Sequence, residues 1–164
     1  MREIPITKGL VAMVDDADYQ DLNKFRWSAD NNGGRQTYAA RKEGPRGGQK
    51  KITMHRQIMG FPPRPLVVDH INGDPLDNRR CNLRLTDHRG NAANSAKRQG
   101  SSRFKGVCWD AERGLWFAQI KTNGAHINLG RFQDERAAAE AYDAAAREHH
   151  GEFAKTNFPL NAGR

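Results

Sequence analysis

Four polar residues in the middle of the sequence have the side-chain types that metal-assisted hydrolysis requires. Asp69 and His70 are adjacent, and Asn82 and Asn91 follow, the latter 21 residues after His70 (91 − 70). A neutral imidazole has an unperturbed pKa of about 6.5, so His70 can accept a proton from water near pH 7. Mg²⁺ prefers oxygen ligands, and the Asp69 carboxylate and the Asn91 amide oxygen meet that preference while leaving positions for phosphate and water. The set therefore favours phosphodiester hydrolysis, with the metal as Lewis acid and template.

A shared site requires that the side chains of Asp69 and His70 lie on the same side of their strand. A purely structural role for the pair stays open as an alternative. Neighbouring residues of a strand point to opposite faces, so Asp69 and His70 share a site only if a strand end or bulge relaxes that rule. An isolated Asp-His pair is more often a hydrogen-bonded structural pair. Asp74 and Asp77 lie in a Gly- and Pro-containing loop, where Asp caps turns more often than it binds metal. His55 could approach the site, but a core or hydrogen-bonded histidine is the favoured interpretation.

The elements that position these residues must lie within residues 61–98. Three prolines in 61–65 exclude a helix interior there. Asn72-Gly73-Asp74-Pro75 is a strong turn signal. Packing the final helix over the two strands would bring Asn91 near the strand end. The predicted order is strand, turn-rich loop, strand and helix, at 66–71, 72–75, 82–85 and from Thr86 or Asp87 to about Arg98.

The segment from Val68 to Leu85, VDHINGDPLDNRRCNLRL, resembles the HNH homing endonucleases of phages and bacteria, as does the Asn91-Ala92-Ala93-Asn94 that follows. The resemblance implies a ββα-metal (His-Me finger) core over residues 61–98. It implies that His70 is the general base and that Asp69 and Asn91 bind one divalent metal, Mg²⁺, for which Mn²⁺ can substitute. Asn82 would have a mainly structural role in bracing the loop. Asn91 stands where many HNH enzymes have His, although the Asn form is familiar among homing members.

The residues before this segment are predicted to form a β-rich region, 1–60, that supports the nuclease. They contain short β-like stretches, the last of them from Lys51 to His55, and one helical stretch from Asp16 to Lys24, with Asp15 or Asp16 as its N-cap. The loop 41–51 is rich in Gly, Lys and Arg. It is equally consistent with a solvated hairpin tip and with a contact to phosphate.

The residues after the linker 99–102 show a second pattern. Three alternating stretches, 104–109, 116–121 and 126–129, are separated by turn signals, of which Asn123-Gly124 is a good hairpin signal. A helix is predicted from Asp134 to His149, closed by Gly151, with alanines on its buried face. The order predicts a three-stranded antiparallel sheet with one helix.

Charge is distributed unevenly along the chain. The net charge of +8 and the pI near 9.9 favour an anionic partner such as nucleic acid. Residues 101–164 contain nine Lys/Arg and eight Asp/Glu, a net +1, which leaves +7 on residues 1–100. Within the second half, 103–131 has five bases and two acids (+3), and 132–164 has four bases and six acids (−2). These values predict a basic sheet and an acidic helix.

Residues 103–160 resemble the AP2/ERF DNA-binding domain, through Lys105-Gly106-Val107, 116–120, 129–132, 137–145 and Asn157-Phe158-Pro159. The resemblance implies that the sheet enters the major groove of DNA, into which a β-ribbon fits. Cys108 and Asp110 stand where plant domains often have arginine, so a target sequence cannot be carried over. The residues expected to contact DNA are Arg103, Lys105, Trp109, Arg113, Gln119, Lys121, His126 and Asn128.

The sequence therefore predicts an α+β protein: a ββα-metal nuclease core with a β-rich N-terminal region, followed by an AP2-like sheet and helix. The expected activity is nicking of double-stranded DNA, since the chain has one active site. Two alternatives are a non-enzymatic DNA-binding regulator with an HNH scaffold and, less favoured, an RNA-directed protein. No protein partner is evident.

Composition bounds the other classes. No apolar run approaches the roughly 20 residues of a membrane span, and no hydrophobic stretch near the N-terminus suggests secretion. Cys81 and Cys108 are isolated, which excludes a zinc ribbon and disfavours a disulfide framework. We therefore expect a reducing, cytoplasmic location, in a bacterial or phage-infected cell.

Overall fold

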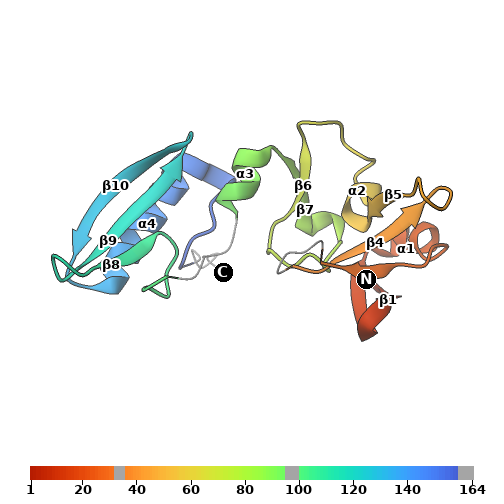
Figure 1. The fold of residues 1–164 in the computed structure, drawn as a ribbon, viewed down its shortest axis with the longest axis horizontal. Coiled ribbons are helices and arrows are strands. Elements are labelled where there is room, and N and C mark those ends of the chain that lie inside the picture. The colour runs from red at the N-terminus through yellow and green to blue at the C-terminus, as the bar shows by residue number, and fades with distance from the viewer. Residues whose placement is uncertain (32–35, 95–99, 159–164) are drawn as a thin grey trace. The chain divides into compact units, whose positions relative to one another are not determined.

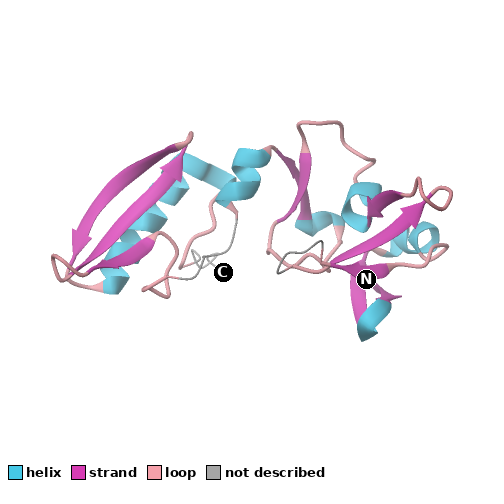
Figure 2. Cartoon of the chain, viewed as in Figure 1, coloured by secondary structure: helices cyan, strands magenta, loops and turns pink. Residues whose placement is uncertain are grey.

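In the computed structural model, which describes residues 1–31, 36–94 and 100–158, the chain separates into two units, Met1–His88 and Arg89–Arg164. Each unit combines small antiparallel sheets or hairpins with a few helices, as predicted for an α+β protein (Figures 1 and 2). The boundary lies before the predicted linker, 99–102. Residues 95–99, which include the predicted end of the helix near Arg98, lie outside the described residues. No helix of the described chain is long and apolar enough to cross a membrane.

The described residues of the first unit form three antiparallel β-structures around one apolar core. Ile4 and Ile6 alternate with exposed residues along the first strand, as a half-buried strand requires, and they pack with Val14, Met54 and Leu83. The paired strands are β1 (Arg2–Ile6) with β2 (Leu10–Val14), β3 (Ser28–Asp30) with β4 (Tyr38–Glu43) and β5 (Lys50–Thr53), and β6 (Val67–His70) with β7 (Leu83–Thr86).

Short helical segments connect these strands. The helix predicted from Asp16 is α1 (Asp16–Leu22), and it follows β2 directly. The structure differs from the prediction at Met54 and His55, which were expected to end a strand but begin α2 (Met54–Ile58). Single turns of 3-10 helix also occur, at η1 (Thr7–Gly9) and η2 (Arg80–Asn82).

The helix α3 (His88–Ala93) starts at the last residue of the first unit, and the second unit contains a three-stranded antiparallel sheet in the order β10-β9-β8, as predicted. Asn123 and Gly124 both have positive φ (50° and 84°) at the turn between β9 and β10, the conformation of a type I′ hairpin. The sheet strands are β8 (Val107–Asp110), β9 (Leu115–Thr122) and β10 (Ala125–Phe132).

One face of this sheet is covered by α4 (Glu135–His150), close to the predicted helix, and η3 (Gly151–Phe153) follows it (Figure 1). The Asp134 carboxylate caps α4 by accepting a hydrogen bond from Ala137 N at 2.8 Å. The buried face of α4 consists largely of alanines, which pack against Ala118 and Ile120 of β9. Small side chains let the helix lie close to the sheet.

The segment after α4 is held on the unit by one buried carboxylate. Asp143 of α4 accepts hydrogen bonds from the backbone N–H groups of Asn157 and Phe158, each at 2.7 Å. Asn157 in turn accepts from Lys105 N at 2.6 Å and donates to Lys105 O at 3.1 Å, just before β8. The Asn157-Phe158 pair therefore joins the C-terminal segment, the helix and the sheet.

Candidate active site

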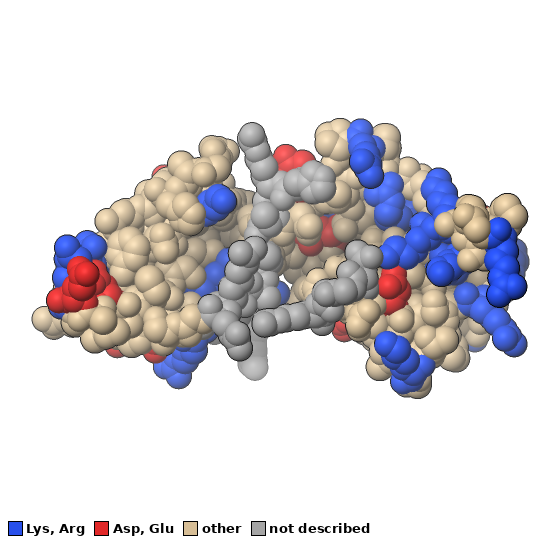
Figure 3. Space-filling view, viewed as in Figure 1, with Lys and Arg blue, Asp and Glu red and all other residues tan. Residues whose placement is uncertain are grey.

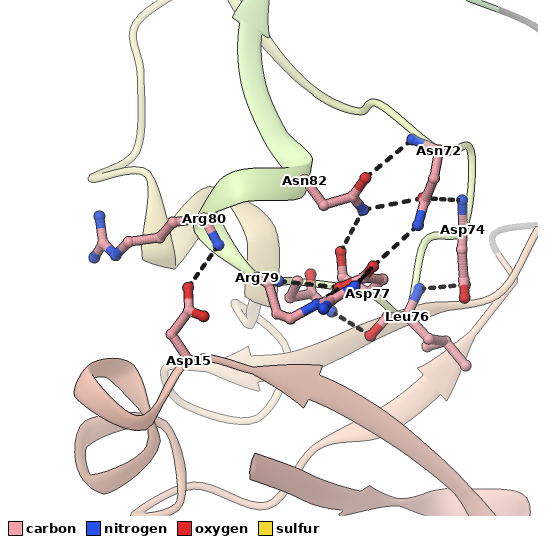
Figure 4. Close-up of polar contacts among 9 residues, drawn as sticks. Asp15, Asn72, Asp74, Leu76, Asp77, Arg79, Arg80 and Asn82 are labelled. Atoms are coloured by element: carbon pink, nitrogen blue, oxygen red, sulfur yellow. Dashed lines mark hydrogen bonds and ion pairs between the residues drawn. The ribbon is translucent and has the colours of Figure 1, made fainter. Parts of the chain in front are cut away.

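The loop between β6 and β7 is braced by the side chain of Asn82 (Figure 4). Its Oδ1 accepts from Asn72 N at 2.9 Å, and its Nδ2 donates to Asn72 Oδ1 at 3.0 Å and to Asp77 O at 2.8 Å. Asn82 thus bonds across the loop at three points. These hydrogen bonds are consistent with a structural role for Asn82, which holds the loop together.

Asp74 and Asp77, which could have been metal ligands, serve the loop itself. The Asp74 carboxylate accepts from Leu76 N at 3.0 Å, as in a side-chain-capped turn. The Asp77 carboxylate binds the Arg79 guanidinium through two contacts of 2.7 Å and accepts from Asn72 Nδ2 at 3.0 Å. The Arg79 guanidinium lowers the pKa of Asp77, so this carboxylate stays ionised within the loop.

The same loop is attached to the N-terminal hairpin. Met13 of β2 donates to Leu76 O and accepts from Asn78 N, both at 2.8 Å. Arg80 N donates to the Asp15 carboxylate at 2.8 Å, and the Arg80 guanidinium pairs with Asp18 at 2.7 Å. Residues 10–18 therefore form a platform for the loop.

His70 ends β6 as a buried side chain directed toward this loop. Its Nε2 lies 3.4 Å from Asn78 Oδ1, and Asn78 Nδ2 donates to Leu76 O at 3.1 Å, which turns the amide oxygen toward the imidazole. In this arrangement Nε2–H is the donor and the neutral ring keeps its lone pair on Nδ1. Burial lowers the pKa of His70 below 6.5, although Asn78 and nearby carboxylates oppose the shift. The ring is therefore neutral at pH 7.

Two aromatic residues that the motif does not contain lie against His70. The His55 ring packs edge-on, with centroids 5.1 Å apart and planes at 83°, and the Tyr38 ring lies 6.2 Å away. Tyr38 also contacts His55, at 5.5 Å. His55 is a buried histidine, as predicted, but it is also a neighbour of the candidate base. No local pattern signals this, because the contact depends on how β4 and α2 pack against the β6–β7 hairpin.

His55 makes the stability of the first unit sensitive to acid. Burial, together with the charges of His70 and Arg56, lowers the pKa of His55 from 6.5 to about 3. Between these values the unfolded chain binds a proton that the folded unit does not, so stability falls as the pH falls. We expect His55 to lower the free energy of unfolding by about 1.4 kcal/mol per pH unit below about pH 6. Urea unfolding at about pH 7, 6 and 5 measures this slope.

The matched variant is His55→Phe, which keeps a ring against His70 but cannot titrate. It should show a shallower slope, while the lowered pKa of His70 leaves part of the acid sensitivity in place. Equal slopes in the two proteins would show that His55 is protonated in the folded unit.

Asp69 faces a different partner from that of His70. Asp69 and His70 pair with Arg84 and Leu83 of β7, so their side chains leave opposite faces of the hairpin. The buried Asp69 carboxylate accepts from Arg84 Nε at 3.0 Å and pairs with Nη2 at 2.9 Å through Oδ2. Its charge still acts on His70, whose pKa it raises against the effect of burial.

Asn91 is exposed on α3, in the second unit. Its role beside Asp69 stays a prediction. In chemical terms, one carboxylate and one amide oxygen form the sparse, oxygen-only ligand set that Mg²⁺ uses next to substrate phosphates. The donor atoms are therefore of the kind that Mg²⁺ binds.

The predicted DNA contacts of the second unit divide into two groups. Ala118 and Ile120 point toward α4, so Phe117, Gln119 and Lys121 of β9 point to the opposite, outer face of the sheet. His126 and Asn128 pair with Lys121 and Gln119 and share that face. Arg113 lies in the turn between β8 and β9. These residues form an open surface away from the helix.

Three further predicted contacts have other surroundings. Trp109 pairs with Trp116, on the helix side of the sheet, with ring centroids 5.0 Å apart. Lys105 Nζ donates to the Ala93 carbonyl at 2.6 Å, and burial lowers its pKa to about 8. Arg103 contacts Glu135 of α4 at 3.5 Å. Residues that sequence reasoning did not select, Asp110, Phe117 and Arg131, lie on the outer face instead.

Two family models match the chain. Residues 53–93 match the HNH endonuclease model, and residues 102–152 match the AP2 domain model. The first match contains His55, His70 and the braced loop, and the second contains the three-stranded sheet and α4. Both matches agree with the resemblances stated from the sequence.

Some relatives match most of the chain and others match a shorter part of it. An uncharacterized HNH endonuclease, L560 of Acanthamoeba polyphaga mimivirus, is 30% identical over 155 residues, 92% of this chain and 76% of the relative. Protein 3.8 of Escherichia phage T7 is 30% identical over 122 residues, 74% of this chain and 98% of that protein. The AP2/ERF and B3 domain-containing protein Os01g0141000 of Oryza sativa subsp. japonica is 51% identical over 65 residues, 40% of this chain. The chain covers only 18% of that plant protein.

Proposed function

The chain belongs to the HNH endonuclease family, and from this we propose that it is a metal-dependent DNA endonuclease whose second unit binds the target duplex. The observation that carries the proposal is the position of His70. The imidazole is neutral at pH 7, is oriented by Asn78 and ends a strand beside a loop that Asn82 holds rigid. A preorganised base of this kind suits proton abstraction from water.

In the proposed reaction, His70 accepts the proton of the attacking water on Nδ1 while Nε2–H donates to Asn78. Asp69 and Asn91 would hold one Mg²⁺, or Mn²⁺ in its place, in the ββα-metal core that the resemblance to HNH endonucleases implies. When bound, the cation neutralises charge on the scissile phosphate and stabilises the leaving 3′ oxygen. Arg84 keeps the Asp69 carboxylate in a fixed orientation through its two contacts.

One active site per chain predicts nicking of one strand, whereas a dimer on a palindromic site would cut both. Incubation of supercoiled plasmid with the protein tests the activity directly. Conversion to open circles in Mg²⁺ and not in EDTA is the expected result. Absence of conversion in either Mg²⁺ or Mn²⁺ would contradict the nuclease proposal.

A second candidate function is a non-enzymatic DNA-binding regulator. It is favoured by one observation, the ion pair of Asp69 with Arg84, which already neutralises the carboxylate that the metal would use. The plasmid assay separates the two candidates when it is combined with a binding assay. Sequence-selective binding without cleavage in either metal is the outcome that identifies a regulator.

The proposed partner is double-stranded DNA, contacted through phosphates and through the outer face of the β8–β9–β10 sheet. Lys and Arg side chains are abundant on the visible face of the first unit (Figure 3), in keeping with the 15 Lys/Arg and 11 Asp/Glu of residues 1–88, a net +4. Among the predicted contacts, Gln119, Lys121, His126 and Asn128 are on the outer face, and Arg113 is at its end. Arg103, Lys105 and Trp109 would need to leave their present partners to reach DNA.

The affinity for DNA is expected to fall steeply as salt rises, because cations bound to phosphate are released when Lys and Arg replace them. If about four phosphates are neutralised, the association constant falls by roughly 100-fold between about 50 and 200 mM salt. Fluorescence anisotropy with a labelled duplex in EDTA measures this without cleavage. An association constant that stays flat over that range would contradict phosphate contacts by the basic residues.

A further inference from the structure

A carboxylate links two arginines at one end of the second unit's sheet. Asp110 Oδ2, at the end of β8, accepts from Arg131 Nε of β10 at 2.8 Å and from Arg113 Nη1 of the β8–β9 turn at 3.3 Å. Charges of both signs are visible together at this end of the sheet (Figure 3). We call Asp110, Arg113 and Arg131 the arginine–carboxylate cluster.

The register of the sheet places the cluster on the outer face. Cys108 pairs with Phe117, and Asp110, two residues further along β8, shares the face of Cys108. Arg131 also pairs with Phe117, and its guanidinium lies over the Phe117 ring at 5.1 Å. The cluster thus lies beside Gln119, on the surface proposed to meet DNA.

The contacts of Asp110 exceed what a turn requires. Its Oδ1 accepts from Arg113 N at 3.3 Å, which is an ordinary side-chain cap of the β8–β9 turn. The bond to Arg131 adds nothing to that turn, because Arg131 comes from the far edge strand. The Arg131 guanidinium is held by the Asp110 carboxylate on one side and by the Phe117 ring on the other, while the Arg131 side chain remains 35% exposed.

A carboxylate on a DNA-binding surface is unfavourable next to phosphate but is complementary to base edges. In the major groove, guanine presents two acceptors, N7 and O6, and its paired cytosine presents the N4–H₂ donor beside them. Arginine is the usual partner of guanine, and a carboxylate accepts from cytosine N4. An arginine and a carboxylate held side by side are therefore complementary to one G·C base pair.

We infer that the arginine–carboxylate cluster reads a G·C pair in the major groove and that Asp110 is a specificity-determining residue of the recognition unit. The inference rests on the proposed function, because it assumes that the outer face of the sheet meets duplex DNA. Arg131 would donate to guanine and Asp110 would accept from cytosine N4. Phosphate contacts at this end of the sheet would be few.

Selection of bound duplexes from a randomised library, in EDTA so that no strand is cut, tests the inference. The variant is Asp110→Asn, because Asn can still cap the turn through its amide oxygen. Glu112→Gln is the matched control: it removes the same charge from the same turn, and the Glu112 side chain is 88% exposed and lies 3.6 Å from Arg113, to which the inference assigns no base contact. We expect Asp110→Asn to lose its preference for G·C at one position by on the order of tenfold, and Glu112→Gln to keep it.

The other outcomes are equally informative. An unchanged preference at every position in Asp110→Asn overturns the inference, whatever its affinity. A wild-type protein that selects no sequence overturns both the inference and the recognition role of the second unit, while plasmid nicking tests the nuclease proposal separately. If thermal unfolding shows that Asp110→Asn is unfolded, Arg131→Lys replaces it, because Lys keeps the charge but not the Nε contact. Loss of the G·C preference in Arg131→Lys would support the inference, and an unchanged preference would overturn it.

Discussion

Replacement of His70 by alanine is expected to lower the rate of Mg²⁺-dependent plasmid nicking by about 10²- to 10⁴-fold, the usual contribution of a general base. The physical reason is that the neutral imidazole, oriented by Asn78, is the proton acceptor of the proposed reaction. The initial rate of open-circle formation at saturating protein measures the effect. Affinity for duplex DNA in EDTA should change little, since His70 is buried within the first unit.

The matched control for this prediction is His149→Ala, which removes an exposed imidazole from α4. It should nick plasmid at the wild-type rate. A His70→Ala protein that is folded by thermal unfolding and nicks at the rate of the control would remove His70 from the mechanism.

Replacement of Gly106 by alanine is expected to destabilise the second unit by about 3 kcal/mol or more, through two separate terms. Gly106 has φ of +77°, in the region that L side chains disfavour. A Cβ built there would lie 1.9 Å from Cδ2 and 2.3 Å from Cε2 of Tyr142. Tyr142 belongs to the buried face of α4, so it cannot move without opening the core between the helix and the sheet. Urea unfolding monitored by circular dichroism measures the loss.

Gly114→Ala separates the two terms. Gly114 also has positive φ, +64°, but a Cβ there meets nothing within 4 Å. It should therefore show only the backbone term, about 1 to 2 kcal/mol. Equal destabilisation by the two substitutions would mean that the ring of Tyr142 adapts to the new methyl group. In Gly106→Ala a smaller fraction of the molecules should have a folded second unit, and the measured affinity for DNA should fall in proportion to that fraction.

Features that depend on neighbours along the chain were predictable from the sequence. The Asn123-Gly124 hairpin, the Asp134 cap and the alanine face of α4 all arise from contacts within a few residues. Backbone conformational preferences and helical periodicity fix such features locally. The family motif around His70 was equally visible, because it is contiguous.

Features that depend on strand register and packing were not predictable. The placement of His55 against His70, and the attachment of the β6–β7 loop to Met13, join residues far apart in sequence. Asp110 was noted only as a departure from the plant pattern, and Trp109 was expected on the surface that meets DNA. The register of β8 against β9 puts Asp110 on the outer face and Trp109 on the helix side.

The sequence by itself therefore determined which chemical groups this protein has, the order of most of its elements and the families that it resembles. Only the tertiary structure decided which groups meet: Asp69 with Arg84, His70 with Asn78 and His55, and Asp110 with Arg131. The physical reason is that a shift of one residue in strand register reverses the face of every side chain. Register is set by burial of the whole core, which no short segment of sequence contains.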